Sequence, residues 1–344
     1  MAYTTINKPS ATAFNTKLYT GNGTDDRSIT GVGFQPDWVW LKQRNGTNYH
    51  TSFDSVRGAT KRIFPNVNET EDTNADSLQA FETDGFQVGT NGGVNGNTNT
   101  YVAWNWLANG TGSANTDGSI NSTVSVNTTS GFSIVSYTGT GANATVGHGL
   151  GVIPKVIITK ARTESGRFWG VYHASNGNTG SQPLNDAQAF DVSSTYWQNT
   201  NPTSSYFSVG INGDTNASSG MIAYCFAEKT GYSKFGSYTG NGNADGTFVY
   251  TGFKPAFVLL KQTNEARDWL MMDNKRLGYN PNNYDLHPNG SDVEDNNPRL
   301  DLLSNGFKQR ATSSANNKSG GTFIYMAFAE APLVGSNNVP CTAR

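Results

Sequence analysis

The sequence predicts an all-β protein made of three tandem antiparallel β-sandwiches of jelly-roll type. Three observations lead to this fold class: a composition rich in turn-forming residues, short β-branched and aromatic runs that begin after prolines, and a unit of 88 to 91 residues that occurs three times. A sandwich of seven to nine short strands occupies about 100 residues, so each copy is large enough to form one.

The composition favours strands joined by tight turns. Charged residues make up 15% of the 344 residues, against about 25% in an average globular protein. Ten Asn-Gly and three Asp-Gly pairs interrupt the chain, and such pairs favour the left-handed conformations of two-residue hairpin turns. Only residues 75–81 carry a spacing that suits one or two turns of helix.

The same pentapeptide opens each copy of the unit, as YTGNG at residues 19–23, YTGTG at 137–141 and YTGNG at 238–242. The first and third copies are identical at 13 of 26 positions from this Tyr onward, without a gap. Residues kept in all copies are expected to serve the fold, because a catalytic group rarely needs triplication, and the first Gly is expected to supply a turn conformation closed to other residues. These structural positions are Tyr19, Gly21, Pro36 and Lys42; Tyr137, Gly139, Pro154 and Lys160; and Tyr238, Gly240, Pro255 and Lys261.

The strands of each copy are placed by the Pro and by the end of the unit. Pro has no N–H to donate, so it marks a strand start, and WVWLK, KVIITK and FVLLK each follow one. The three copies end with YVAWNW, MIAYCF and FIYMAF, and counted from the Tyr they are 88, 90 and 91 residues long. The first and third copies also match in the middle, where IFPNVNETED aligns with LHPNGSDVED. The second copy diverges there.

These landmarks divide the chain into six segments. The segment between the first two copies begins as a linker, and its alternating STVSVN is expected to add a strand to the second sandwich. The predicted segments are an N-terminal docking arm at 1–14, repeat 1 at 15–108, a linker at 109–117, repeat 2 at 118–229, repeat 3 at 230–332 and a C-terminal tail at 333–344.

Charge, hydropathy and cysteine content exclude several classes of partner. The net charge is −2 and no basic run is present, so nothing in the sequence favours binding to nucleic acid. No apolar run approaches the roughly 18 residues of a membrane span, so no membrane insertion is expected. Cys225 and Cys341 lie far apart and are interpreted as free thiols of a protein made in a reducing cytoplasm.

The motifs of common catalytic, metal and cofactor sites are missing or incomplete. There is no GxSxG elbow and no phosphate-binding GK[ST] loop. Asp72, Asn74 and Asp76 have the spacing that opens a calcium loop, but Ser77 and Thr83 stand where Gly and Glu are needed. The histidines His50, His148, His173 and His287 show no metal spacing, and His173, which aligns with Asp54 and Asp273, is expected at a surface or strand edge. We therefore expect no enzyme activity, no metal and no cofactor.

Aromatic residues supply the candidates for ligand contact. Trp38 and Trp40 share one strand face, as do Trp104 and Trp106, and core packing explains them better than sugar stacking because apolar residues fill the matching positions of the other copies. Loop aromatics that differ between the copies are better candidates for host or ligand contact, although folding back onto the sandwich is the alternative. They are Tyr49, His50, Tyr196, Trp197, Tyr279 and Tyr284.

The sequence resembles a module common in virion proteins of marine tailed bacteriophages, often described as tail-fibre-like or lectin-like. The resemblance is carried by GFQPDWVWLK, FDSVRGATK, SLQAFETDGFQVG and YVAWNW in the first copy, by VYHASNG in the second, and by AYCFAEKTGYSKFGSYTGNGNADGTFVYTGF and the closing EAPLVGSNNVP. It spans nearly the whole chain. The second copy departs most in its middle, and the family supplies no catalytic residues to carry over.

This resemblance implies a structural or adhesive protein of a virion, assembled in the bacterial cytoplasm and released by lysis. The leading hypothesis is a non-enzymatic tail fibre, tail-tip or baseplate-attached adhesin that contacts the host surface. The alternatives are a head-decorating or tail-bracing architectural protein, whose three units form a pseudo-symmetric ring or clamp, and a polysaccharide depolymerase. The implied partners are other virion proteins, a host-surface glycan or receptor, and further copies of the chain in a homo-oligomer.

Overall fold

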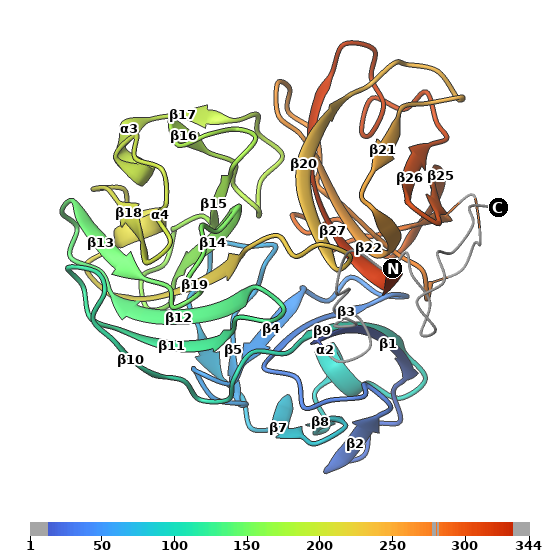
Figure 1. Cartoon of the computed structure of the whole chain (residues 1–344). Coiled ribbons are helices and arrows are strands. Elements are labelled where there is room, and N and C mark those ends of the chain that lie inside the picture. The colour runs from blue at the N-terminus through green and yellow to red at the C-terminus, as the bar shows by residue number, and fades with distance from the viewer. Residues whose placement is uncertain (1–12, 277–279, 281, 333–344) are drawn as a thin grey trace, which may run out of the picture.

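The structure is a computed structural model that describes residues 13–276, 280 and 282–332. It confirms an all-β chain made of antiparallel sheets, and Figure 1 shows three lobes that correspond to the three sequence repeats. The predicted arm and tail at residues 1–12 and 333–344, and Tyr279, lie outside the described residues. Ala13 and Phe14, assigned above to the arm, belong instead to the first lobe, because Phe14 opens its first strand.

Unit 1 contains two facing sheets, with the strand orders β1-β9-β3-β4 and β2-β8-β7, and a small β5-β6 pair. Residues 75–81, which suited a helical turn, lead into strand β7 instead. The elements are β1 (Phe14–Thr20), β2 (Arg27–Thr30), β3 (Trp38–Gln43), β4 (Thr51–Asp54), β5 (Lys61–Arg62), β6 (Asp72–Thr73), β7 (Leu78–Glu82), β8 (Gly85–Val88), α2 (Gly92–Asn95) and β9 (Thr100–Trp106).

Unit 2 has a larger sheet, β10-β11-β12-β19-β14-β15, and two short pairs, β13-β18 and β16-β17. STVSVN forms β11 as predicted, but the linker at 109–117 also contains a strand, because β10 pairs with β11. The elements are β10 (Ser113–Asn115), β11 (Ser122–Asn127), β12 (Phe132–Thr138), β13 (Ala144–Gly147), β14 (Val156–Ala161), β15 (Gly170–His173), β16 (Gly180–Ser181), β17 (Asp191–Val192), α3 (Ser194–Trp197), β18 (Tyr206–Val209), α4 (Gly213–Asn216) and β19 (Gly220–Phe226).

Unit 3 repeats the plan of unit 1, with the strand orders β20-β27-β22-β23 and β21-β26-β25-β24. Pro255 lies inside strand β22, at a bulge in its pairing with β27, rather than before the strand. The elements are β20 (Ser233–Thr239), β21 (Phe248–Tyr250), β22 (Phe253–Gln262), β23 (Leu270–Asp273), β24 (Asn282–Asp285), β25 (Asp295–Leu303), β26 (Gly306–Gln309) and β27 (Thr322–Pro332).

One sheet of each unit is buried on both faces. Along β3, Val39 and Leu41 pack into the core of unit 1, while Trp38 and Trp40 point the other way, into a cluster that all three units share. The same alternation holds along β9, β14, β19, β22 and β27. Because successive side chains of a strand point to opposite faces, a strand covered on both sides reads as a continuous apolar run.

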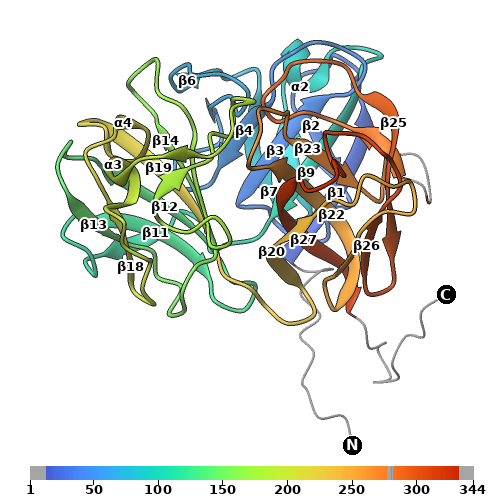
Figure 2. The same ribbon diagram turned by 90° about the horizontal axis from the view of Figure 1, so that it is seen from above.

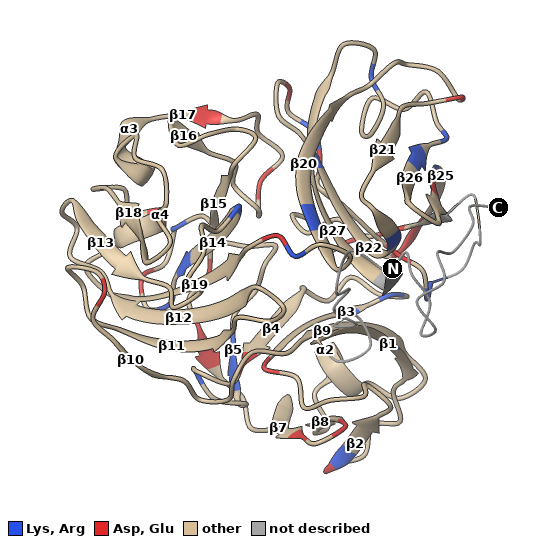
Figure 3. Cartoon of the chain, viewed as in Figure 1, with Lys and Arg blue, Asp and Glu red and all other residues tan. Residues whose placement is uncertain are grey.

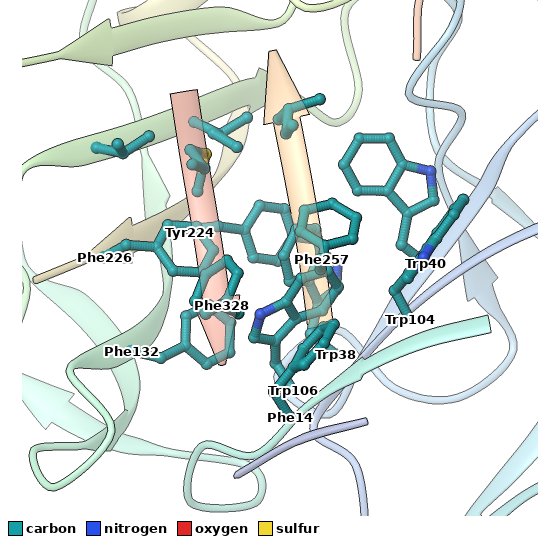
Figure 4. Close-up of a cluster of buried hydrophobic side chains, with 14 of the residues drawn as sticks. Phe14, Trp38, Trp40, Trp104, Trp106, Phe132, Tyr224, Phe226, Phe257 and Phe328 are labelled. Atoms are coloured by element: carbon teal, nitrogen blue, oxygen red, sulfur yellow. The ribbon is translucent and has the colours of Figure 1, made fainter. Parts of the chain in front are cut away.

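The shared cluster joins the three units into one body. Phe14 stacks on Phe328 of unit 3 at 5.4 Å between ring centroids, and Trp38 stacks on Tyr224 of unit 2 at 4.4 Å (Figure 4). Seen from above, β9 of unit 1 lies beside β22 and β27 of unit 3 (Figure 2). The four tryptophans of unit 1 are thus core residues, as predicted, but their core lies between the units rather than within one sandwich.

The repeated pentapeptide forms a loop that a buried Asn holds in place. In unit 1 the Tyr19 hydroxyl donates to the Val94 carbonyl at 2.6 Å, and Asn95 accepts from the backbone N–H of Asn22 at 3.1 Å. In the other units the Tyr137 and Tyr238 hydroxyls likewise donate to the carbonyl before the Asn, and Asn216 and Asn317 accept from the backbone N–H of the pentapeptide's fourth residue. The three Asn residues are buried, as are Tyr137 and Tyr238, while Tyr19 is half-buried, so these bonds fix the loop against the end of each sandwich.

The first glycine of the pentapeptide is required for a reason other than the one predicted. A Cβ added to Gly21 would lie 2.1 Å from the carbonyl oxygen of Gly96, and Gly139 and Gly240 are crowded in the same way. The left-handed conformation belongs to the other glycine, since Gly23 has a φ of 69°. The motif therefore combines one glycine for close backbone approach with one for a turn.

The shared lysines are buried and serve the loops that follow their strands. Lys42 Nζ donates to the Gly46 carbonyl at 2.8 Å, and Lys160 Nζ donates to the Arg167 carbonyl at 2.6 Å. Lys261 Nζ donates to the Ala187 carbonyl of unit 2 at 2.8 Å. Burial lowers the pKa of each lysine to about 8.

Candidate functional site

The units contact one another through equivalent groups. At each junction a backbone N–H donates to the carbonyl two residues beyond the buried lysine of the next unit. The pairs are Glu71 with Arg162, Phe190 with Thr263, and Glu294 with Arg44, at 2.7, 2.8 and 2.8 Å. In the two junctions that begin at a Glu, an ion pair joins the same residues, at 2.9 and 2.7 Å.

The last residue of β4, β15 and β23 also reaches into the next unit. Asp54 accepts from the Tyr224 hydroxyl at 2.7 Å, His173 Nε2 bonds the Tyr325 carbonyl at 3.1 Å, and Asp273 accepts from Trp104 Nε1 at 3.0 Å. All three residues are at most 2% exposed. His173 therefore does not lie at the surface, although β15 is the edge strand of its sheet, and its side chain joins units 2 and 3.

The six candidate contact residues do not form one site. Tyr49 is 42% exposed and Tyr284 is half-buried in β24, whereas His50, Tyr196 and Trp197 are at most 5% exposed. Tyr279 lies outside the described residues. Host contact through His50, Tyr196 or Trp197 would need them at the surface, so the expectation is wrong for these three.

Each buried candidate has a structural partner. His50 Nδ1 accepts from Trp40 Nε1 at 2.9 Å, and burial, followed by the nearby charge of Lys42, lowers the pKa of His50 well below its usual value. Tyr196 and Trp197 lie on the short helix α3 and pack into the core of unit 2, with Trp197 edge-on to Phe207. Loop aromatics this large stabilise the fold by turning inward.

Tyr49 lines a groove in unit 1 with a volume of about 460 Å³. Its ring stands edge-on to Phe64, at 5.8 Å between centroids, and Arg62 lies over the Phe64 ring at 5.3 Å. Asp72 accepts two hydrogen bonds from Arg62, at 2.5 and 2.7 Å. This surface, called the Tyr49 groove, is lined by Asn48, Tyr49, Arg62, Phe64, Asp72 and Gly92, together with neighbouring backbone and polar groups.

Unit 2 fills the corresponding space with an arginine. Arg167 takes the place of Asn48, and Gly213 takes the place of Gly92, as the strand registers and the helices α2 and α4 show. A Cβ added to Gly213 would meet the guanidinium carbon of Arg167 at 2.4 Å, whereas a Cβ added to Gly92 meets none of the described residues within 4 Å. The groove is therefore open in unit 1 and occupied in unit 2.

Unit 3 differs at the same positions in its own way. Arg267 stands in place of Asn48, and Asp268 in place of Tyr49. Asp268 accepts from the side chain of Asn289 at 2.7 Å, and Arg267 pairs with Glu265 at 3.7 Å. Unit 2 keeps an aromatic at the position of Tyr49, the half-buried Phe168, so unit 1 is distinguished by a more exposed ring beside an open groove.

Sequence reasoning found Tyr49 but missed the other side of the groove. Arg62 and Asp72 lie on the short pair β5-β6, and their long-range pairing brings Asp72 back beside Tyr49. The Pro-Asn motif shared by the first and third copies was a signal that this segment returns to Tyr49. Asn66 accepts from the backbone N–H of His50 at 3.0 Å, and Asn289 accepts from that of Trp269 at 2.9 Å. Asn185 does the same in unit 2, at 2.8 Å, so the divergent middle of that copy keeps the contact.

Charged residues of both signs occur along the chain in all three lobes (Figure 3). Within the part of the chain that the structure describes, no helix has both the length and the apolar character needed to cross a bilayer. Cys225 is fully buried in the core of unit 2, and burial raises the pKa of its thiol. This agrees with the interpretation of Cys225 as a free thiol.

Comparison with protein families gives one match over most of the chain. The family model described as a domain of unknown function (DUF7483) matches residues 8–332, which include all three units. The comparisons with curated proteins and with solved structures found no match.

Proposed function

Since the chain belongs to the DUF7483 family, whose description assigns no function, we propose a role from its own surface and sequence. It is a non-enzymatic component of a bacteriophage virion, namely a tail fibre, tail-tip or baseplate-attached adhesin that contacts the host surface through the Tyr49 groove. The observation that supports contact at this place is the difference between copies: one unit keeps the groove open beside an exposed tyrosine, and another fills it. The assignment to a virion rests on the sequence resemblance.

The position of the chain on the particle tests this proposal. Cryo-electron microscopy of a phage that encodes the chain should place it at the distal end of the tail. A position on the capsid lattice, in the copy number of a lattice protein, would refute the adhesin. Purified protein should also bind host cells, and the change Tyr49→Ala should weaken that binding more than Tyr250→Ala, which removes a tyrosine 60% exposed on unit 3.

A specific observation also supports the architectural alternative. The three units share one aromatic core and equivalent junctions, so the chain forms a rigid body of the kind that decorates a head or braces a tail. The same imaging decides between the two roles. A depolymerase would release reducing ends from host polysaccharide, and their absence after incubation with purified protein would dismiss that role.

Self-association of the chain remains a prediction. Three units in one chain already provide a threefold arrangement, so an oligomer would combine several such bodies. Light scattering of the purified protein should give a mass that is a multiple of 36.9 kDa. A monomeric mass in solution, with single copies on the particle, would contradict the prediction.

A further inference from the structure

The Tyr49 groove presents one fixed aromatic ring next to polar groups. Phe64, itself only 8% exposed, supports the Tyr49 ring from the protein side, while 42% of Tyr49 remains accessible. Two amide side chains belong to the lining: Asn48, which donates to Gln43 Oε1 at 2.5 Å and to the Gly92 carbonyl at 3.1 Å, and Asn91, which caps helix α2. An aromatic platform with convergent polar groups is typical of sites for small amphipathic ligands.

The charges of the groove disfavour an anionic ligand. Arg62 is the cation of its lining, and Asp72 already occupies two of its N–H groups. Glu69, which is exposed, adds a second carboxylate. One paired cation and two carboxylates leave a net charge of −1, which repels carboxylates, sulfates and phosphates.

The size and the depth of the groove suit one ring-sized ligand. Its volume of about 460 Å³ lies within the usual range of small-molecule pockets, about 300–1,000 Å³. Glycines at positions 92 and 93 keep its floor low, since the described residues leave the space above Gly92 free to 4 Å. In unit 2 the Arg167 side chain takes up this space, which shows that a group of about that size fits there.

We propose that the Tyr49 groove binds an uncharged pyranose unit of a surface glycan. The apolar C–H face of the ring packs on Tyr49, and its hydroxyls donate to the Asp72 and Glu69 carboxylates and accept from the side-chain amide of Asn91. This assignment deepens the proposed adhesin and rests on it for the biological role, but the binding itself can be measured on the isolated chain. The groove binds the sugar without any covalent step.

Saturation-transfer NMR with the full chain tests the assignment. The probes are methyl α-D-glucopyranoside, methyl α-D-mannopyranoside and methyl β-D-galactopyranoside as neutral sugars and D-galacturonate as an anion. A ligand of this size is expected to bind with a Kd of about 1 mM. At least one neutral glycoside should give a signal, and D-galacturonate should give none.

Two substitutions locate the binding, and each has a matched control. Tyr49→Ala removes the platform, and Asn48→Arg places in unit 1 the residue that fills the groove of unit 2; each should weaken binding at least about tenfold. Tyr250→Ala removes an exposed tyrosine of unit 3, and Asn109→Arg adds the same charge outside the groove, so both should bind as the unmodified chain does.

Several outcomes would overturn the assignment. It fails if no neutral glycoside gives a signal, if Tyr49→Ala and Asn48→Arg bind normally, or if D-galacturonate binds more tightly than every neutral sugar. Imaging of the particle is independent of these results. A distal tail position without sugar binding would refute only the ligand assigned to the groove. Sugar binding by a protein located on the capsid would refute only the adhesin role.

Discussion

Removing one hydroxyl at a junction should destabilise the whole chain. The Tyr224 hydroxyl of unit 2 donates to Asp54 of unit 1 at 2.7 Å, and both residues are fully buried. In Tyr224→Phe, Asp54 keeps its bond from Arg57 Nε at 2.5 Å but loses one charge-assisted donor. A hydrogen bond to a charged group contributes about 1.5–3 kcal/mol to the free energy of unfolding.

Guanidinium chloride unfolding, followed by tryptophan fluorescence, measures this loss. With a denaturant dependence of about 5 kcal/mol per M, the midpoint should fall by about 0.3–0.6 M. Six of the seven tryptophans lie in the shared cluster, so the fluorescence reports on the junctions themselves. Tyr250→Phe removes the same hydroxyl from an exposed residue and should leave the midpoint unchanged within error.

The result also tests whether the three units unfold together. A core shared by all units predicts one cooperative transition, whose midpoint Tyr224→Phe shifts as a whole. Separate transitions, or a shift no larger than that of Tyr250→Phe, would refute the conclusion that the junction stabilises all three units.

The other predictions concern packing, protonation and thiol access. Gly21→Ala should lower the free energy of unfolding, measured in urea, by at least about 1–3 kcal/mol, because the new methyl lies 2.1 Å from a backbone oxygen. Gly220→Ala is the control: its new methyl has 3.8 Å of room, so the free energy of unfolding should change by no more than about 0.5 kcal/mol. Burial lowers the pKa of His173 to about 4, so the unfolded chain, with a His pKa of about 6.5, takes up the proton first as the pH falls, and stability is lost between about pH 6.5 and 4. His173→Gln should make that loss smaller, and part of what remains comes from His50, whose pKa burial also lowers. In a Cys341→Ser variant, Cys225 should react with iodoacetamide only at the rate of unfolding, because its thiol is buried, and fast labelling of the native chain would contradict this.

The sequence carried the repeat, the strands and the turns, because these depend on local chemistry. The sequence also indicated a second buried face, since WVWLK and FVLLK are apolar on both strand faces. In a sheet with one face in water, apolar and polar residues would alternate along the strand. What periodicity could not give was the partner of the second face. That partner lies in another unit, about 170 to 190 residues away in the case of Trp38 and Tyr224 or Trp104 and Asp273.

The site was predictable only in part, for a related reason. Comparison of the copies identified Tyr49 as a residue that the other units replace, and the structure places it in the groove. The same comparison also selected His50 and Trp197, because a difference between copies does not say whether a side chain faces water. His50 differs because it packs where the other units place Trp169 and Trp269 in the shared core.

The junctions determine how many copies of the unit one chain can hold. Unit 1 bonds unit 2, unit 2 bonds unit 3, and unit 3 bonds unit 1 through equivalent groups, so every donor and acceptor surface is already used. An open array of repeats can lengthen by one unit at either end. A fourth tandem copy of the unit would find no free junction among the described residues, so its insertion would have to break one of the three existing junctions. Gene duplication within this lineage is therefore expected to stop at three, and later change to proceed by divergence of the individual units, as at Tyr49.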